Sequence, residues 1–264
     1  MRKFLFISIP IVIFASSCGE GREGGDSNHV DNRTRSEMII DSAIAFHGGE
    51  KYYGHDISFG FRDRMYGISR SANSFVYTST YSDSLGVHHR ELSNDGLVVH
   101  LNGERVALSA KDSTAYAASV NSVVYFAMLP SLLTDDAVRS VYEGDESING
   151  KSYYRVKVTF TEEGGGEDHD DVYLYWFDTT DYSLDFLAYS FLVENGGTRF
   201  RAVTNTRRIN GIVFQDYENY KGPAPDSLQY ILEMYKAGSL TLLSNIELNR
   251  ISVIERPTAI SSLN

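Results

Sequence analysis

Hydrophobic and polar residues alternate along most of the chain, and two neighbouring runs show the pattern best. In Tyr153–Phe160, every second residue from Tyr154 onward is apolar, and Arg, Lys and Thr lie between them. A period of two predicts a half-buried β-strand. The next run, Val172–Phe177, is apolar on both sides, as in a central strand with both faces covered. We therefore expect a β protein built around this pair of strands.

More runs of the same character extend over most of the sequence. The predicted strands are Ile57–Ser69, Ser74–Tyr81, Val87–Ser93, Leu97–Leu101, Arg105–Leu108, Val138–Ile148, Leu184–Val193, Thr198–Ile209, Ile212–Tyr220 and Leu240–Ile254. Five links contain Asp-Gly or Asn-Gly, the pairs that two-residue hairpin turns require: Asp95-Gly96, Asn102-Gly103, Asn149-Gly150, Asn195-Gly196 and Asn210-Gly211. Consecutive hairpins make the strands antiparallel and exclude a parallel βαβ architecture.

Three helices are predicted beside these strands. Ser36–Phe46 begins at a plausible capping serine, and a second helix begins with a capping-box-like pattern at Ser109 and continues over Lys111–Met128. Ser227–Ala237 is the third. A long antiparallel sheet twists and curls, and three helices cannot cover both of its faces. We therefore predict a mainly β fold: one curved antiparallel sheet, a half-barrel of about 10–12 strands, with helices plugging its concave face.

The first residues are a targeting segment and are excluded from the fold. A positively charged start precedes the apolar run Phe4–Phe14, which is too short to span a bilayer. Small residues then precede Cys18, the single cysteine. The stretch resembles a bacterial lipoprotein signal, in which this cysteine becomes the lipidated N-terminus; an ordinary secretory signal is the alternative. Gly19 follows the cysteine, which resembles lipoproteins anchored in the outer membrane.

These features predict four segments. Residues 1–17 form the signal peptide, and residues 18–35 form a lipidated cysteine with a glycine-rich, charged tether. Residues 36–257 form a single half-barrel β domain, and residues 258–264 a frayed tail. The expected location is the cell envelope, with the membrane as a partner through the N-terminal lipid.

The charge of the chain excludes one class of partner. There are 35 acidic and 24 basic residues, for a net charge of −11. Nucleic-acid binding requires an excess of Lys and Arg, so we expect no nucleic-acid partner. No motif implies a cofactor.

An acidic loop, Glu162–Asp171, offers the clearest candidate ligands for a metal ion. Its three glycines precede Asp168, Asp170 and Asp171, and dense carboxylates are what Ca²⁺ prefers. The spacing does not match an EF-hand, so we favour a solvated loop and assign no metal. The histidines are scattered, and His47 is expected to end its helix as a residue favoured by the helix dipole.

Enzymatic activity has no motif to support it. The serines do not occur in a Gly-x-Ser-x-Gly elbow, and lipidation would leave no thiol nucleophile. Paired carboxylates for hydrolysis need only proximity in space. A hydrolase therefore stays the third hypothesis.

The start of the expected domain resembles a known family. A helix that ends in His47-Gly48-Gly49, the aromatic pair Tyr52-Tyr53 and the strand Ile57–Arg64 resemble the opening of lipoprotein-localisation-factor-like domains. Those domains are half-barrels with helices at the mouth, and they bind acyl chains inside. The resemblance implies a ligand cavity on the concave face.

Three other segments resemble an uncharacterised family of predicted Gram-negative envelope lipoproteins. They are Asn121–Phe126, Gly164–Asp171 leading into Tyr175-Trp176, and Gly196–Arg201. This resemblance extends over nearly the whole mature chain but implies no activity.

The alternation also identifies candidate binding residues. Arg62 and Arg64 are expected on one face of their strand, and Arg199 and Arg201 on one face of theirs. Arginines at a cavity mouth can bind an anionic headgroup; ordinary outward-facing alternation is the alternative. The residues expected to line the cavity are Tyr154, Val156, Val158, Trp176 and Phe200.

Two main hypotheses follow. The first is a tethered, non-enzymatic module that binds a lipid or another apolar ligand in the half-barrel, with Lys111–Met128 as plug or lid. The second is a structural lipoprotein with a filled core that contacts other envelope proteins through its acidic surface.

Overall fold

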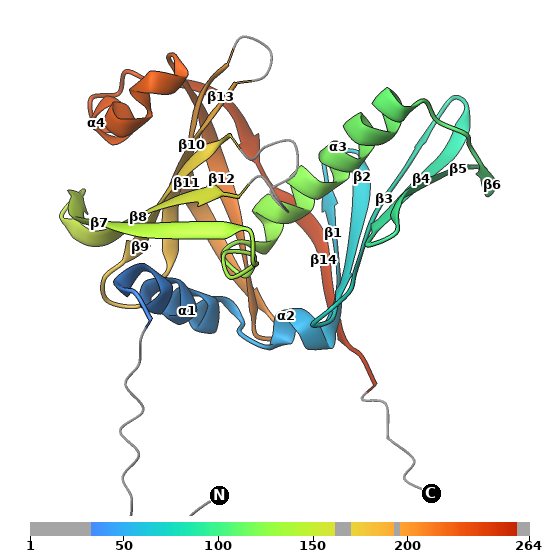
Figure 1. Ribbon diagram of the computed structural model, residues 1–264, viewed down its shortest axis with the longest axis horizontal. Coiled ribbons are helices and arrows are strands. Elements are labelled where there is room, and N and C mark those ends of the chain that lie inside the picture. The colour runs from blue at the N-terminus through green and yellow to red at the C-terminus, as the bar shows by residue number, and fades with distance from the viewer. Residues whose placement is uncertain (1–32, 162–169, 193–195, 258–264) are drawn as a thin grey trace, which may run out of the picture. The chain divides into compact units, whose positions relative to one another are not determined.

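The computed structural model describes residues 33–161, 170–192 and 196–257, which belong to one compact unit, Arg33–Asn264 (Figure 1). In these residues the strands form two seven-stranded antiparallel sheets. The first sheet contains β1 (His55–Phe61), β2 (Arg64–Arg70), β3 (Phe75–Asp83), β4 (Gly86–Ser93), β5 (Gly96–Leu101), β6 (Glu104–Arg105) and β14 (Leu248–Glu255). The second contains β7 (Val138–Ile148), β8 (Lys151–Phe160), β9 (Val172–Asp178), β10 (Leu184–Phe191), β11 (Gly197–Ile209), β12 (Ile212–Gly222) and β13 (Thr241–Ile246).

Both sheets follow the chain almost strand by strand. The order is β14-β1-β2-β3-β4-β5-β6 in the first sheet and β13-β12-β11-β10-β9-β8-β7 in the second. The hairpin turn at Asn149-Gly150 has positive φ at both residues, 51° and 82°, a conformation that Asn and Gly adopt at low cost. The prediction of a mainly β fold with antiparallel strands is confirmed, but the strands divide into two sheets instead of one.

Two of the expected strands are broken, which explains the larger number of strands. Ile57–Ser69 contains a turn at Arg62-Asp63, where Arg62 has a φ of 54°. Leu240–Ile254 divides at Glu247 into β13 and β14. Neither break contains an Asx-Gly pair like those of the five predicted hairpin turns, so the sequence pattern did not indicate them.

The second of these breaks joins the two sheets. β13 pairs with β12, whereas β14 pairs with β1, so the chain passes from one sheet to the other at Glu247. Asp216 on β12 holds this junction: it accepts hydrogen bonds from the Leu248 amide at 2.9 Å and from Arg207 Nη2 at 2.7 Å. Burial alone would raise the pKa of Asp216, but these hydrogen bonds hold it below its usual range.

The helices lie against the sheets. They are α1 (Arg35–His47), α2 (Lys51–Gly54), α3 (Ala110–Met128), the 3-10 helix η3 (Pro225–Tyr230) and α4 (Ile231–Lys236). The predicted helix from Ser109 is confirmed as α3, with the Ser109 hydroxyl accepting from the Asp112 amide at 3.1 Å. α1 begins one residue before the expected Ser36, because Thr34 is its cap and forms a capping box with Glu37. The pair Tyr52-Tyr53 lies in the short α2.

In the part of the chain that the structure describes, three buried clusters make up the core. One joins the inner side of the first sheet to Val120, Val124 and Met128 of α3. A second lies on one face of the second sheet, under α1. The third lies on the opposite face of the second sheet, under α4. α3 therefore lies between the two sheets (Figure 1), and both faces of β9 are covered, as the sequence predicted.

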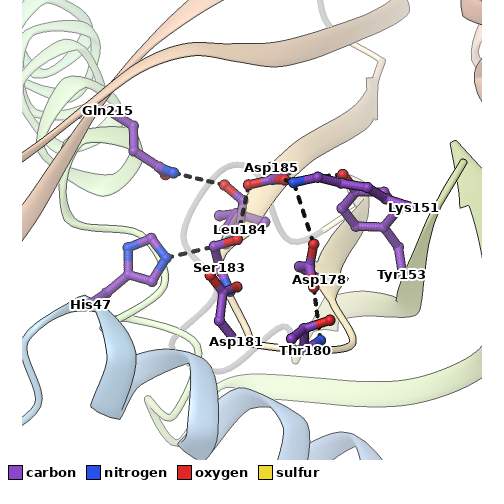
Figure 2. A network of polar contacts seen from close by, with 10 residues as sticks. All are labelled: His47, Lys151, Tyr153, Asp178, Thr180, Asp181, Ser183, Leu184, Asp185 and Gln215. Carbon is purple, nitrogen blue, oxygen red and sulfur yellow. Dashed lines mark hydrogen bonds and ion pairs between the residues drawn. The ribbon is translucent and has the colours of Figure 1, made fainter. Parts of the chain in front are cut away.

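A polar network ties α1 to the turn between β9 and β10 (Figure 2). His47 is fully buried, and its Nε2 accepts a hydrogen bond from the Leu184 amide at 3.1 Å. Burial, aided by the nearby Arg208, lowers the pKa of His47 from 6.5 to about 3. The expectation that His47 ends its helix is confirmed, but the lowered pKa makes this histidine neutral, so a favourable interaction of a cation with the helix dipole does not apply. In the described residues, none of the helices has the length and apolar character needed to cross a membrane.

Candidate functional site

Two pockets flank α3, and Ser122 and Phe126 of this helix line both of them. The larger has a volume of about 490 Å³ and the smaller about 180 Å³. Other depressions of about 500 to 690 Å³ lie away from α3, and charged or polar residues such as Glu50, Lys51 and Asp136 form much of their walls. The pair beside α3 is therefore the candidate site for an apolar ligand.

The larger pocket is lined mainly by aromatic side chains. They come from both sheets and from the helix: Phe75, Tyr77, Tyr125, Phe126, Phe160, Tyr173, Tyr189 and Phe191. Leu132 and Val138 add aliphatic surface, and one wall carries the ion pair of Arg70 and Asp135, whose closest atoms lie 3.1 Å apart. A wide apolar pocket with a few polar groups is the usual form of a site for a small hydrophobic molecule.

Tyr125 of the larger pocket is hydrogen-bonded to Tyr175, a buried residue of β9 that does not itself line the pocket. The hydroxyls of Tyr125 and Tyr175 lie 2.7 Å apart, and burial raises the pKa of both residues. Because neither hydroxyl ionises near neutral pH, the pair can share one hydrogen bond without charge repulsion. The wall behind α3 therefore stays apolar in character.

The smaller pocket lies between α3, the turn after β1 and the strands β11 to β14. It combines apolar residues with the polar side chains of Arg62, Arg201, Gln215, Asn219 and Ser244. Among the described residues that line it there is no Asp or Glu, although the chain as a whole is strongly acidic. The pocket is therefore a positively charged site in an acidic protein.

Arg201 lies at the boundary of the two pockets. Its guanidinium carbon lies 3.7 Å from the ring centre of Phe126, which lines both pockets. Its Nη2 donates to the Tyr189 hydroxyl at 3.4 Å, and Tyr189 lines the larger pocket. The residue is only 8% exposed. A cation stacked on an aromatic ring at this depth is held in place by the ring and the hydroxyl.

The polar wall next to Arg201 is fixed by hydrogen bonds. Burial raises the pKa of Tyr217, so its hydroxyl stays protonated and donates to Gln215 Oε1 at 2.9 Å. Gln215 Nε2 in turn donates to the Leu184 carbonyl at 2.8 Å (Figure 2). These hydrogen bonds hold the Tyr217 and Gln215 side chains in place on the pocket wall.

The structure separates the four predicted arginines. Arg62 and Arg201 both line the smaller pocket, and Arg199 packs 4.8 Å from the ring centre of Phe191. Arg199 and Arg201 share one face of β11, as expected. The placement of Arg62 and Arg64 on one strand face is wrong: Arg62 lies in a turn, and Arg64 on β2 packs 4.1 Å from the ring centre of Tyr81.

The predicted lining residues do not share one cavity. Val156 and Val158 are buried in the core under α1, and Tyr154 packs beside Tyr142 and Tyr182. None of the three lines the pockets beside α3.

Trp176 and Phe200 point to the opposite face of the second sheet, where Tyr235 of α4 stacks 4.4 Å from Phe200. The expectation that they line the cavity with Val156 is corrected, because alternation on β9 and β11 directs them away from it.

The sequence analysis did not predict most of the residues that line the two pockets beside α3. Asn219 and Gln215 gave no signal, since polar residues on a strand are ordinary. Tyr125 and Phe126 belong to α3, the helix that was predicted to plug the concave face. That prediction was the one feature of the sequence analysis that could have identified them as lining residues.

The metal candidates gain no support from their placement. Asp171 is buried and lines the larger pocket, with Asp170 beside it in sequence. In the part of the chain that the structure describes, no three His, Cys, Asp or Glu side chains come together as a metal site would need. Asp168 lies outside the described residues, as do Cys18, the predicted signal peptide and tail, and Asn195 of one predicted turn.

Comparisons with known proteins agree with this architecture. The model of a family of unknown function, DUF6503, matches residues 29–247. No curated protein matches the sequence. The crystal structure of a LolA superfamily protein from Nitrosomonas europaea is similar at 12% identity and a TM-score of 0.50, over 86% of this chain and 96% of that chain. At that identity the likeness establishes the fold alone.

Two other solved structures align with lower scores. A DUF1329 family protein from Desulfovibrio piger is 12% identical over 83% of this chain and 93% of that chain, with a TM-score of 0.42. The lipoprotein LppX from Mycobacterium tuberculosis is 14% identical over 61% of this chain and 91% of that chain, with a TM-score of 0.26.

Proposed function

We propose that this chain, which belongs to the DUF6503 family of unknown function, is a non-enzymatic protein that binds a lipid or another apolar ligand beside α3. The observation that carries the proposal is the larger pocket, about 490 Å³ in volume and lined mainly by aromatic residues. Sites for small hydrophobic ligands have volumes of roughly 300–1,000 Å³ and the same apolar character. The pocket lies between the two sheets, where a half-barrel would hold its ligand.

The remainder of the proposal concerns location. A lipidated Cys18 would anchor the protein to the envelope, in the outer membrane, and the segment before the described residues would tether the domain. The support is the signal-like sequence that ends in Cys18, together with the likeness of the fold to a LolA superfamily protein. Radiolabelled palmitate incorporation, lost in Cys18→Ala, tests the anchor.

Binding is tested with a neutral fluorescent probe, N-phenyl-1-naphthylamine, and with native mass spectrometry of the gently extracted protein. Wild type is expected to enhance the fluorescence of the probe and to carry co-purifying lipid. Ser122→Phe places a ring where the two pockets meet and is expected to abolish both signals. Ser119→Phe makes the same exchange at an exposed position of the same helix, so it is the matched control and should bind as wild type does.

Two results would contradict the proposal. One is a wild-type protein that neither binds the probe nor carries lipid. The other is equal binding by wild type and by a folded Ser122→Phe protein. Either result would leave the structural hypothesis, in which the domain acts through its surface.

A further inference from the structure

Arg201 differs in its partners from two other arginines of the second sheet. Arg155 pairs with Glu143 and Glu146, at 3.0 and 2.8 Å, and Arg207 pairs with Asp216. Arg201 is more deeply buried than either, yet in the described residues it pairs with no carboxylate, and its Nε has no hydrogen-bond partner. A buried guanidinium without an anion is costly, so this arrangement calls for an acceptor.

A second unsatisfied atom lies beside it. Asn219 on β12 is directly opposite Arg201 on β11, and both line the smaller pocket. Asn219 Nδ2 donates to Ser244 Oγ at 3.3 Å, whereas its Oδ1 is buried and has no partner among the described residues. A flip of this amide would direct its N–H groups into the pocket instead. Either orientation adds a polar contact beside the guanidinium.

The position of Arg201 connects this polar site to the apolar one. The ring of Phe126, on which the guanidinium stacks, lines both pockets, and Tyr189, which accepts from Arg201, lines the larger one. A ligand with its chain in the larger pocket can therefore place its end at Arg201. The smaller pocket, at about 180 Å³, has room for a small headgroup and not for a second chain of the same size.

Among the described residues, Arg90 and Arg155 also have a buried Nε without a hydrogen-bond partner. Arg155 is paired with two carboxylates, and Arg90 does not offer such a site either. Arg90 stacks 3.8 Å from the ring centre of Tyr116 and 5.6 Å from that of Tyr81, and it lines neither of the pockets beside α3. Burial alone therefore does not identify a binding arginine, whereas burial at a pocket wall does.

We propose that Arg201 and Asn219 form an oxyanion site, and that the ligand is a single-chain amphiphile with a carboxylate or phosphate head. This deepens the proposed function, on which it rests. The two oxygens of such a head match the side-on donors of a guanidinium, Nε–H and Nη–H, which bind carboxylates and phosphates bidentately. A neutral lipid of the same chain length would leave the buried Arg201 without an anionic partner and would bind more weakly.

The experiment compares three ligands of one chain length as displacers of N-phenyl-1-naphthylamine: palmitate, 1-hexadecanol and palmitoyl lysophosphatidate. Wild type is expected to bind one or both anions at least about 10-fold more tightly than the alcohol, the factor that a charge-assisted hydrogen bond is worth. Arg201→Gln should remove that preference, so that the anions and the alcohol bind to the variant with similar affinities. The matched control is Arg199→Gln, two residues along the same face, which lines neither pocket and should keep the preference.

The outcomes separate the two proposals. Preference for palmitate assigns a carboxylate head, and preference for lysophosphatidate a phosphate head; both support the site. Equal binding of all three ligands to wild type, or a preference that survives Arg201→Gln, overturns the oxyanion site and leaves the apolar pocket intact. No binding of any ligand to wild type overturns the proposed function as well. The wild-type comparison stands by itself if Arg201→Gln does not fold.

Discussion

The buried neutral histidine makes the stability of the domain depend on pH in a defined way. His47 is fully buried, its Nε2 accepts a hydrogen bond from the Leu184 amide, and its pKa is lowered to about 3 (Figure 2). Above pH 6.5 the residue is neutral in both the folded and the unfolded chain. Between pH 6.5 and 3 the unfolded chain binds a proton that the folded chain does not, so stability falls as the pH falls.

The size of this loss follows from the two pKa values. Each pH unit between them is worth about 1.4 kcal/mol, so we expect the folded state to lose about 2 kcal/mol between about pH 7.5 and pH 5 through His47 alone. For a domain of this size, that loss corresponds to a fall in Tm of about 4–8 °C. Urea denaturation at a series of pH values measures it directly.

The variant His47→Gln isolates the contribution of this residue. Its side-chain oxygen can accept from the Leu184 amide but cannot take up a proton. The variant is expected to be less stable than wild type at about pH 7.5 and to lose about 2 kcal/mol less than wild type on going to pH 5. The other histidines are present in both proteins, so their effects cancel in the difference. Equal pH dependence in the two proteins would refute the assignment of a neutral buried His47.

Two further changes test the junction and the faces of the second sheet. Asp216→Asn weakens the hydrogen bonds to Arg207 and to the first amide of β14, so it should lower the free energy of unfolding by about 2–3 kcal/mol in a urea titration. The control is Asp226→Asn, at an exposed position. An equal effect of the two substitutions would contradict the role of Asp216 in holding the junction between the sheets. Phe200→Ala, under α4, should lower the free energy of unfolding by about 3–4 kcal/mol. The affinity for the fluorescent probe should change by no more than about twofold, because the larger pocket is on the other face of the second sheet. A large loss of probe binding by the folded variant would contradict that separation.

Local patterns in the sequence were sufficient to predict many of the strands and turns of the fold. The predicted strand Val138–Ile148 coincides with β7, and the run Tyr153–Phe160 lies within β8, because Asn149-Gly150 fixes the turn between two alternating runs. The turn at Arg62 was missed because it forms without glycine, and its positive φ is set by the pairing of β1 with β2. Such a turn is decided by tertiary contacts, which a local pattern does not contain.

The site depended more strongly on long-range geometry. Alternation correctly placed Arg199 and Arg201 on one face of β11, but the pattern of β9, apolar on both sides, does not indicate which face meets α3. The pairing of Arg201 with Asn219 depends on the register of β11 and β12 across a bulge between Val203 and Asn205. The predicted side is therefore wrong for Trp176 because both faces of β9 are apolar, and Asn219 was not predicted because the local pattern does not contain the register of β11 and β12.

The crossing at Glu247 also bears on the order in which the domain assembles. β1 pairs with β14, in a register that joins His55 to Glu255, and β12 pairs with β13. Neither sheet can therefore be completed before the last two strands have been synthesised, and β1 and β12 present unpaired edges until then. Contacts so distant in sequence predict slow folding, and the newly made chain has an aggregation-prone interval that a chaperone would shorten.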